Sequence, residues 1–211
     1  MLVFDGCAGT GSATKAFADR GNTVETLDIE GEHTYVCDIR EFHPEKHYDF
    51  MWFSPPCTEF SIANYRLGAC KYRTPDLSIV QACFRIVSEA KPEFWLIENP
   101  KGCLRHFIGK PVITVNYSDY GYFSKKPTDL WGVFPEFISP VPANDKPVSF
   151  IKATWGLSKD SVAERAHVPY GLSLAICTAV EKIINSHGSS ELHESIAVTR
   201  NGDPTLCGSL P

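Results

Sequence analysis

Cys57 lies on a segment suited to presenting a thiol for chemistry. The apolar run Tyr48–Phe53 has the pattern of a buried strand, and Ser54-Pro55-Pro56-Cys57 follows it directly. Because proline cannot donate a ladder hydrogen bond, the two prolines end the strand and stiffen the backbone that carries Cys57. Ligands of open α/β sheets bind at the ends of strands, so Cys57 is a candidate nucleophile.

A carboxyl group follows the next apolar run. Phe94–Ile97 predicts another strand, and Glu98-Asn99-Pro100 comes directly after it. If the two strands are parallel neighbours, Cys57 and Glu98 lie at the same edge of the sheet. A nucleophilic thiol and an acid in one pocket suit covalent catalysis with proton transfer.

A glycine-rich turn follows the first expected strand, Leu2-Val3-Phe4. It carries Gly6, Gly9 and Gly11, which allow a tight turn and close approach to a ligand. The turn is neither G-x-G-x-x-G nor a Walker loop, so a phosphate site is not favoured. Asp28 ends the second expected strand, where a carboxylate can hold ribose hydroxyls. Asp38 ends the third.

Three of these segments together resemble the cytosine C5 DNA methyltransferase family. They are Phe4-Asp5-Gly6-Cys7-Ala8-Gly9-Thr10-Gly11-Ser12, Ser54-Pro55-Pro56-Cys57 and Glu98-Asn99-Pro100. Each motif alone is a weak signal, but three in this order, each after an apolar run, make a strong one. The resemblance covers roughly residues 1–184 and implies an α/β fold: a doubly wound, mostly parallel sheet of the Rossmann-like methyltransferase type.

The resemblance implies S-adenosylmethionine as cofactor. The glycine-rich turn would cradle it, Asp28 would hold the ribose, Ile29 would pack on the adenine and Asp38 would bond the adenine amino group. A pocket lined by carboxylates without Lys or Arg suits a sulfonium cation. The cofactor-binding residues so implied are Phe4, Asp5, Gly6, Cys7, Ala8, Gly9, Thr10, Gly11, Asp28, Ile29, Asp38, Ile39, Ser54, Pro55 and Ser173.

The resemblance also implies the catalytic roles. Cys57 would add to C6 of cytosine, which makes C5 nucleophilic, while Glu98 assists at N3. The residues implied to contact the substrate are Ser54, Asn99, Pro100, Lys125 and Lys126. The two lysines lie where the family usually has an Arg-rich segment, and the Lys-Pro-Thr-Asp-Leu-Trp run resembles small phage-type members.

The chain lacks the bulk of a target-recognition domain. Residues 132–161 are expected to form a short loop in its place, within one catalytic domain of residues 1–187. The expected partner is DNA, duplex or single-stranded, with recognition relaxed or supplied by a partner protein. Two alternatives remain open: the same chemistry on RNA or a cytosine nucleotide, and a catalytically silent nucleic-acid-binding relative.

Charge is unevenly distributed along the 211 residues, whose net charge is −5. Residues 1–59 hold 4 Lys/Arg and 11 Asp/Glu, whereas residues 60–130 hold 10 and 6. The basic excess follows the proposed nucleophile and could track a phosphate backbone; charge alone favours a scattered, solvated surface equally.

Composition excludes several other classes. The eight cysteines form neither C-x-x-C pairs nor zinc spacings, so no metal is expected. No apolar run is long enough for a membrane span, and the start has no signal-peptide pattern, so a cytoplasmic protein without disulfides is expected. Residues 188–211 are polar and are expected to be a flexible tail.

The remaining pattern predicts alternating strands and helices. Helices are expected over 13–20, from Thr74-Pro75-Asp76 to Lys91, from Asp160 or Ser161 to Ala166, and over 171–186. Further strands are expected over 23–27, 35–37, 112–117 and 130–134, with Tyr120–Phe123 beginning an antiparallel hairpin.

Overall fold

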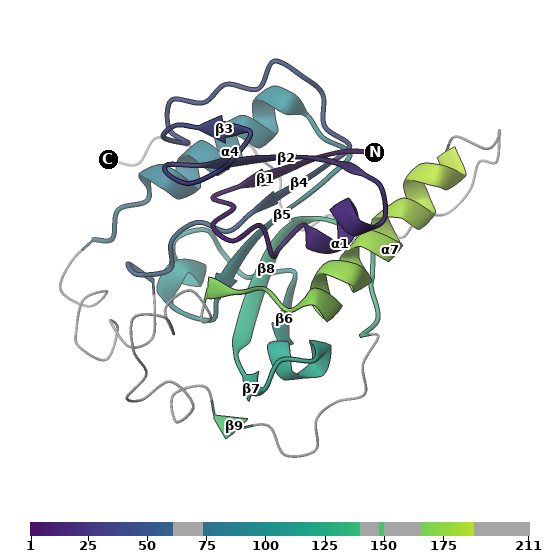
Figure 1. Ribbon diagram of the computed structural model, residues 1–211. Coiled ribbons are helices and arrows are strands. Elements are labelled where there is room, and N and C mark those ends of the chain that lie inside the picture. The colour runs from purple at the N-terminus through teal and green to yellow at the C-terminus, as the bar shows by residue number, and fades with distance from the viewer. Residues whose placement is uncertain (61–73, 140–147, 150–165, 188–211) are drawn as a thin grey trace.

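A seven-stranded sheet forms the centre of the molecule in the computed structural model, which describes residues 1–60, 74–139, 148–149 and 166–187 (Figure 1). The strand order is β3-β2-β1-β4-β5-β8-β6. The strands are β1 (Leu2–Gly6), β2 (Thr23–Asp28), β3 (Tyr35–Val36), β4 (Phe50–Phe53), β5 (Phe94–Pro100), β6 (Ile113–Asn116) and β8 (Pro127–Val133). Two short strands, β7 (Ser124–Lys125) and β9 (Val148–Ser149), pair separately.

Five neighbouring strands, from β3 to β5, are parallel, and β8 is antiparallel to both β5 and β6. The carboxyl ends of β1, β2, β4 and β5 therefore meet at one edge of the sheet. The predicted fold class, a doubly wound and mostly parallel α/β sheet, is confirmed. Buried parallel strands carry continuous apolar runs, as Phe50-Met51-Trp52-Phe53 does in β4.

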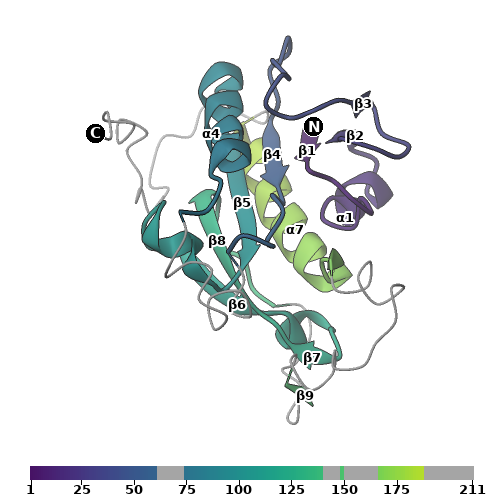
Figure 2. The same cartoon turned by 90° about the vertical axis from the view of Figure 1, so that its left-hand side faces the viewer.

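Helices cover both faces of the sheet, as Figure 2 shows. On one face, α1 (Lys15–Asp19) and α7 (Tyr170–His187) pack on a core that includes Phe17, Trp52 and Ile176. On the other face, α4 (Ser78–Ala90) packs on a second core through Cys83 and Ile86. These two apolar layers hold the strand ends in fixed register.

Several boundaries differ from the sequence expectation. Helix α4 begins at Ser78 rather than near Pro75, because the Asp76 carboxylate accepts a hydrogen bond from the Ser78 backbone N–H (2.8 Å) in a turn before the helix. The predicted hairpin start at Tyr120–Phe123 is wrong. Residues Tyr117–Tyr120 form a 3-10 helix, η2, and the hairpin partner of β6 is β8.

Cys103, in the 3-10 helix η1 (Cys103–His106), is disulfide-bonded, against the expectation of no disulfides. Spacing along the sequence could not reveal this, since pairing depends on which loops meet in space. None of the described helices is long and apolar enough to cross a membrane. The expected tail 188–211, the helix near 160–166 except Ala166, and most of the 132–161 loop lie outside the described residues.

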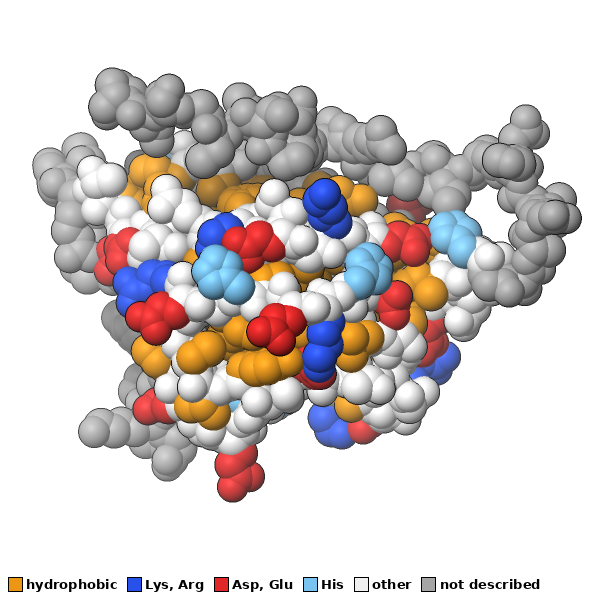
Figure 3. All heavy atoms as spheres, turned by 90° about the horizontal axis from the view of Figure 1, so that it is seen from above, with side chains coloured by type: hydrophobic (Ala, Val, Ile, Leu, Met, Phe, Trp, Pro, Cys, Tyr) orange, Lys and Arg blue, Asp and Glu red, His pale blue; other side chains and the backbone are white. Residues whose placement is uncertain are grey.

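The face seen in Figure 3 carries acidic, basic and histidine side chains intermixed, with apolar side chains between them. It therefore offers no continuous basic surface. Arg105 is one of the basic residues of segment 60–130, but it binds an acidic side chain within the protein. Its Nε donates to an oxygen of Asp129 at 3.0 Å, and Asp129 is fully buried in β8. Thr114 also donates to Asp129, at 2.7 Å, and the trio joins η1, β6 and β8.

Candidate active site

Strands β4 and β5 bring the predicted catalytic segments to the same edge of the sheet. Phe53 pairs with Ile97 in parallel register, so the Cys57 loop leaves the sheet beside Glu98, which lies within β5 and pairs with Leu130 of β8. The side-chain N–H of buried Asn99 donates to the backbone carbonyl of Pro55 at 2.9 Å, which ties the two segments together. The rigid loop expected from the two prolines is therefore held by a buried hydrogen bond, and Cys57 is a half-buried thiol.

Glu98 is a buried carboxyl group. Its Oε1 accepts a hydrogen bond from the hydroxyl of Tyr117 at 2.8 Å, and the Ser54 hydroxyl also interacts with it. Burial raises the pKa of Glu98, against the opposing effects of Lys126 and of the Tyr117 and Ser54 hydroxyls. A raised pKa makes Glu98 easier to protonate, and in its protonated form the carboxyl group can donate a hydrogen bond to a base.

The two adjacent lysines have different environments. Lys125 is exposed, whereas Lys126 is only 5% exposed and its Nζ lies 4.6 Å from the centre of the Tyr117 ring. The charges of Glu98 and Cys57 both act on Lys126. Lys126 thus belongs to the buried site, and Lys125 remains the surface residue that could meet a phosphate.

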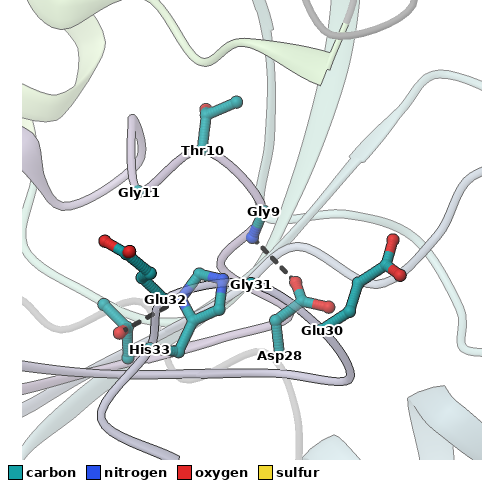
Figure 4. A pocket seen from close by; sticks show the side chains of 9 residues that line it. Gly9, Thr10, Gly11, Asp28, Glu30, Gly31, Glu32 and His33 are labelled. Atoms are coloured by element: carbon teal, nitrogen blue, oxygen red, sulfur yellow. Dashed lines mark hydrogen bonds between the residues drawn. The ribbon is translucent and has the colours of Figure 1, made fainter. Parts of the chain in front are cut away.

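A cavity of about 520 Å³ lies beside the glycine-rich turn. Figure 4 shows Gly9, Thr10 and Gly11 along one side, with Asp28 and His33 opposite. Gly9 has φ +52° and Gly11 has φ +67°, the left-handed region that glycine adopts readily. Asp28 accepts hydrogen bonds from the backbone N–H of Gly9 at 2.8 Å and of Ile29 at 2.7 Å, which fixes the turn against β2.

The cavity fits a cationic nucleoside ligand. Three carboxylates, those of Asp28, Glu30 and Glu32, line it, and none of its lining residues is Lys or Arg. Ile29 is 65% exposed beside them, so a large apolar side chain is available to an aromatic ring. The volume lies within the usual range for small-molecule sites. Among the described residues, no cluster of acidic, His or Cys side chains could hold a metal ion.

Several of the residues implied for the cofactor do not line this cavity. The Asp38 carboxylate is engaged by Arg40, whose guanidinium lowers the pKa of Asp38 to about 2. Ile39 is buried in the core under α4. Ser173 is buried between helices, where its Oγ accepts a hydrogen bond from the Ala16 backbone N–H at 3.1 Å. Ser54 and Pro55 lie at the catalytic edge instead.

The residues at the start of the glycine-rich turn do not line the cavity and are buried or half-buried. Phe4 and Ala8 are buried, and Cys7 is half-buried with φ +58°. A Cβ on Gly6 would lie 2.6 Å from the Phe53 ring, so glycine is required there for β1 and β4 to pack. Pro100 ends β5 opposite Thr128 of β8, close behind Glu98.

Three features of the two sites were not expected from the sequence. They are the contact of Tyr117 with Glu98, the contact of Thr14 with Asp5 and the burial of Lys126. Thr14 donates to Asp5 Oδ2 at 2.7 Å under the glycine-rich turn, while Asp5 Oδ1 has no hydrogen-bond partner among the described residues. Residues 124–128 are Ser-Lys-Lys-Pro-Thr, in which polar and apolar side chains do not alternate, so the sequence carries no signal for the burial of Lys126. Residues 124, 126 and 128 are buried and 125 and 127 are exposed, as in a strand.

Asp5 makes the stability of the fold depend on pH. Burial raises the pKa of Asp5 from 3.8 to about 7, so the native state holds the proton more tightly than the unfolded chain. The contribution of Asp5 is therefore fully present below pH 3.8 and is lost as the pH rises to about 7, with an upper limit of about 4 kcal/mol. We expect Asp5→Asn to remove this dependence, measured by urea unfolding between pH 5 and pH 8.

Asp38→Asn is the matched control. The pKa of Asp38 is lowered to about 2, so its contribution is lost only as the pH falls below 3.8, outside the measured window. The comparison uses the difference in unfolding free energy between each variant and the wild type. A constant difference for Asp5→Asn from pH 5 to pH 8 would contradict the burial account.

The arrangement of fold and site defines a methyltransferase-like α/β enzyme, and comparison with known proteins gives the family. The profile of the C-5 cytosine-specific DNA methylase family matches residues 12–126. The "Probable DNA (cytosine-5)-methyltransferase" of Frog virus 3 (isolate Goorha) is 30% identical over 159 residues, covering 65% of this chain and 73% of the viral protein. The chain belongs to the C-5 cytosine-specific DNA methylase family, whose members are enzymes.

More distant proteins match over shorter shares of their length. Type II methyltransferase M2.ScrFI of Lactococcus lactis subsp. cremoris is 26% identical over 111 residues, 51% of this chain and 29% of that enzyme. The solved structure of the Entamoeba histolytica methyltransferase EhMeth is 12% identical, with a TM-score of 0.48 over 69% of this chain and 57% of that one. The chain thus spans less than two thirds of both proteins.

Proposed function

We propose that this protein transfers a methyl group from S-adenosylmethionine to C5 of cytosine in DNA. The observation that carries the proposal is the pairing of a thiol and a buried carboxyl group, Cys57 and Glu98, at one edge of the sheet in a chain of this family. The cavity beside the glycine-rich turn opens at the ends of β1 and β2, on the same edge. The methyl donor in the cavity and the target cytosine beside Cys57 and Glu98 would therefore meet between these two sites.

The chemistry requires both side chains. Cytosine C5 is a poor nucleophile until a thiolate adds to C6 and turns the ring into an enamine. In that step the Cys57 sulfur forms a bond to C6, while the proton of neutral Glu98 is shared with N3. C5 would then take the methyl group from the sulfonium, whose sulfur keeps the bonding electron pair and becomes a neutral thioether. Loss of the C5 proton to solvent expels the Cys57 sulfur as a thiolate, and the proton shared at N3 returns to Glu98, which restores the ring.

The cofactor supplies an electrophilic methyl group on a positively charged sulfur. The residues proposed to hold it are those of the cavity: the backbone of Gly9–Gly11, the carboxylate of Asp28 on the ribose and the side chain of Ile29 against the adenine. Asp28 already accepts two backbone hydrogen bonds, and each carboxylate oxygen retains a second acceptor site for a hydroxyl group.

Asp28→Asn should weaken S-adenosylmethionine binding by about tenfold or more, equivalent to about 1.4 kcal/mol. The amide removes one acceptor and directs an N–H at the Gly9 backbone, so it disturbs both the ribose contact and the turn. Isothermal titration calorimetry measures the effect. Glu32→Gln is the control, since it removes a charge from the same cavity without touching the turn. An equal loss in both variants would mean that charge alone matters.

The substrate class is tested by transfer of labelled methyl to duplex DNA, single-stranded DNA, RNA and dCMP in parallel. Label at C5 of cytosine in either form of DNA supports the proposal. Label confined to RNA or dCMP would overturn the DNA assignment and keep the chemistry. No label on any substrate, with intact cofactor binding, would favour a silent relative. Sequencing the methylated DNA would show how much recognition a loop at 132–161 provides, the loop proposed to replace a recognition domain.

A further inference from the structure

The most unusual group at the catalytic edge is a buried cation. Lys126 is 5% exposed, at the junction of β7 and β8, and its ammonium lies 4.6 Å from the centre of the Tyr117 ring. The hydroxyl of that same ring donates to Glu98 Oε1 at 2.8 Å. Lysine is almost never fully buried unless an opposite charge accompanies it. The position therefore needs an anion nearby.

The surrounding elements supply two groups that can carry that negative charge. Among the described residues they are Glu98, near the end of β5, and Cys57, on the loop after β4. Burial lowers the pKa of Lys126, and the charges of Glu98 and Cys57 oppose that shift and favour the charged form of Lys126. Among the described residues, the Tyr117 ring also contacts Lys126; burial and Glu98 raise the pKa of Tyr117 well above the usual value, so it stays neutral. One cation thus faces two potential anions in a buried space.

Backbone contacts fix this arrangement. The Lys101 N–H donates to the Pro127 carbonyl at 2.8 Å, and the Tyr117 N–H donates to the Lys126 carbonyl at 3.3 Å. Residues 99 and 100 pair with residues 129 and 128 across β5 and β8. Lys126 is therefore held beside Glu98 from two sides, and the bond from Asn99 to Pro55 brings the Cys57 loop to the same place.

We propose that Lys126 supplies a fixed positive charge in the reaction site. The site also carries one negative charge, which passes from the Glu98 carboxylate to the Cys57 sulfur during activation. This inference rests on the proposed function for its purpose. In the resting site, Cys57 is a thiol and Glu98 a carboxylate. On activation one proton moves from sulfur to carboxylate, so a thiolate and a neutral carboxylic acid arise together and Lys126 keeps its three protons.

This device provides both reactive groups in a single step. The thiolate is the form that adds to C6, and neutral Glu98 is the form that assists at N3. A cation that lies near both groups stabilises the anion in either position, so moving the proton does not leave a buried charge without compensation. Without the cation, burial favours the thiol and the neutral acid, and the thiolate then forms only by losing a proton to solvent.

The test measures alkylation of Cys57 by iodoacetamide in the full-length protein between pH 5.5 and pH 9, quantified on the Cys57 peptide by mass spectrometry. It compares the wild type with Lys126→Met, which loses the charge, and Lys126→Arg, which keeps it. Lys125→Met is the matched control for a neighbouring, exposed lysine. Far-UV circular dichroism and thermal melts establish folding, and Lys126→Gln replaces the methionine variant if that variant does not fold.

We expect Lys126→Met to slow alkylation at pH 7 by about tenfold or more, with a rate that rises with pH as the thiol ionises to solvent. Lys126→Arg should recover more than half of that loss on a logarithmic scale, and methyl transfer should follow the same order through kcat. A Lys126→Met rate within threefold of the wild type would overturn the proposal, as would a smaller recovery by Lys126→Arg. Because alkylation needs no methyl donor or DNA, it tests Lys126 even if methyl transfer is not observed.

Discussion

Cys57→Ala is expected to lower methyl transfer to DNA by about a thousandfold or more, because it removes the sulfur that is proposed to bond to C6. Cys57 does not line the cofactor cavity, so S-adenosylmethionine binding should stay within about twofold of the wild type. The Asn99–Pro55 hydrogen bond does not involve the Cys57 side chain, and the loop should keep its position. Methyl incorporation and calorimetric cofactor binding measure the two quantities separately.

Cys37→Ala is the control for this variant. Cys37 is also a half-buried thiol outside any disulfide, but it lies near β3 and away from Glu98. Its replacement should leave transfer within a fewfold range. Retained transfer in Cys57→Ala would rule out the covalent mechanism, and loss of both transfer and cofactor binding would mean that the variant had lost its fold.

The second large effect is expected at Glu98. Glu98→Gln keeps the shape of the side chain and its hydrogen bond from Tyr117, but an amide cannot transfer a proton to N3. We expect kcat to fall by about a hundredfold or more, with the KM for DNA little changed, since general acid catalysis typically contributes factors of this size. Single-turnover kinetics would separate the chemical step from product release.

Glu93→Gln provides the matched comparison. Glu93 lies just before β5, on the opposite end of the strand from Glu98, and pairs with His187 of α7 at the surface. Its replacement should affect stability slightly and catalysis not at all. A Glu98→Gln variant as active as Glu93→Gln would contradict the role of a neutral acid at N3.

The grouping of the candidate residues at one edge of the sheet could be predicted, because parallel strands all end at the same edge and the candidate residues stand at the ends of apolar runs. The apolar runs Phe50–Phe53 and Phe94–Ile97 lie in β4 and β5. Cys57 follows β4, Glu98 lies near the end of β5 and Asp28 is the last residue of β2, and the parallel topology brings these strand ends together. The prediction needs only the period of the strands and the position of the breaking residues. The fold class followed from the same pattern.

The contacts around those residues could not be predicted. Asp38 has the same place in the pattern as Asp28, yet a guanidinium two residues away occupies its carboxylate. Ser173 lies in the resembling motif, yet packing of α7 on α1 uses its hydroxyl. Lys126 was expected to contact the substrate together with Lys125, and its burial could not be predicted because the neighbouring groups, Glu98 and Cys57, come from distant segments of the chain. Such pairings depend on tertiary packing, which local pattern does not specify.

The central claim is that a covalent bond forms between Cys57 and cytosine, and trapping that bond is the most direct test. In DNA that carries 5-fluorocytosine, fluorine replaces the C5 hydrogen, so the final loss of a proton cannot occur and the sulfur stays attached. With S-adenosylmethionine present, we predict a stable protein–DNA adduct whose peptide maps to Cys57 and which is absent in Cys57→Ala. Methylation of ordinary DNA without any such adduct, or an adduct on another cysteine, would contradict the account.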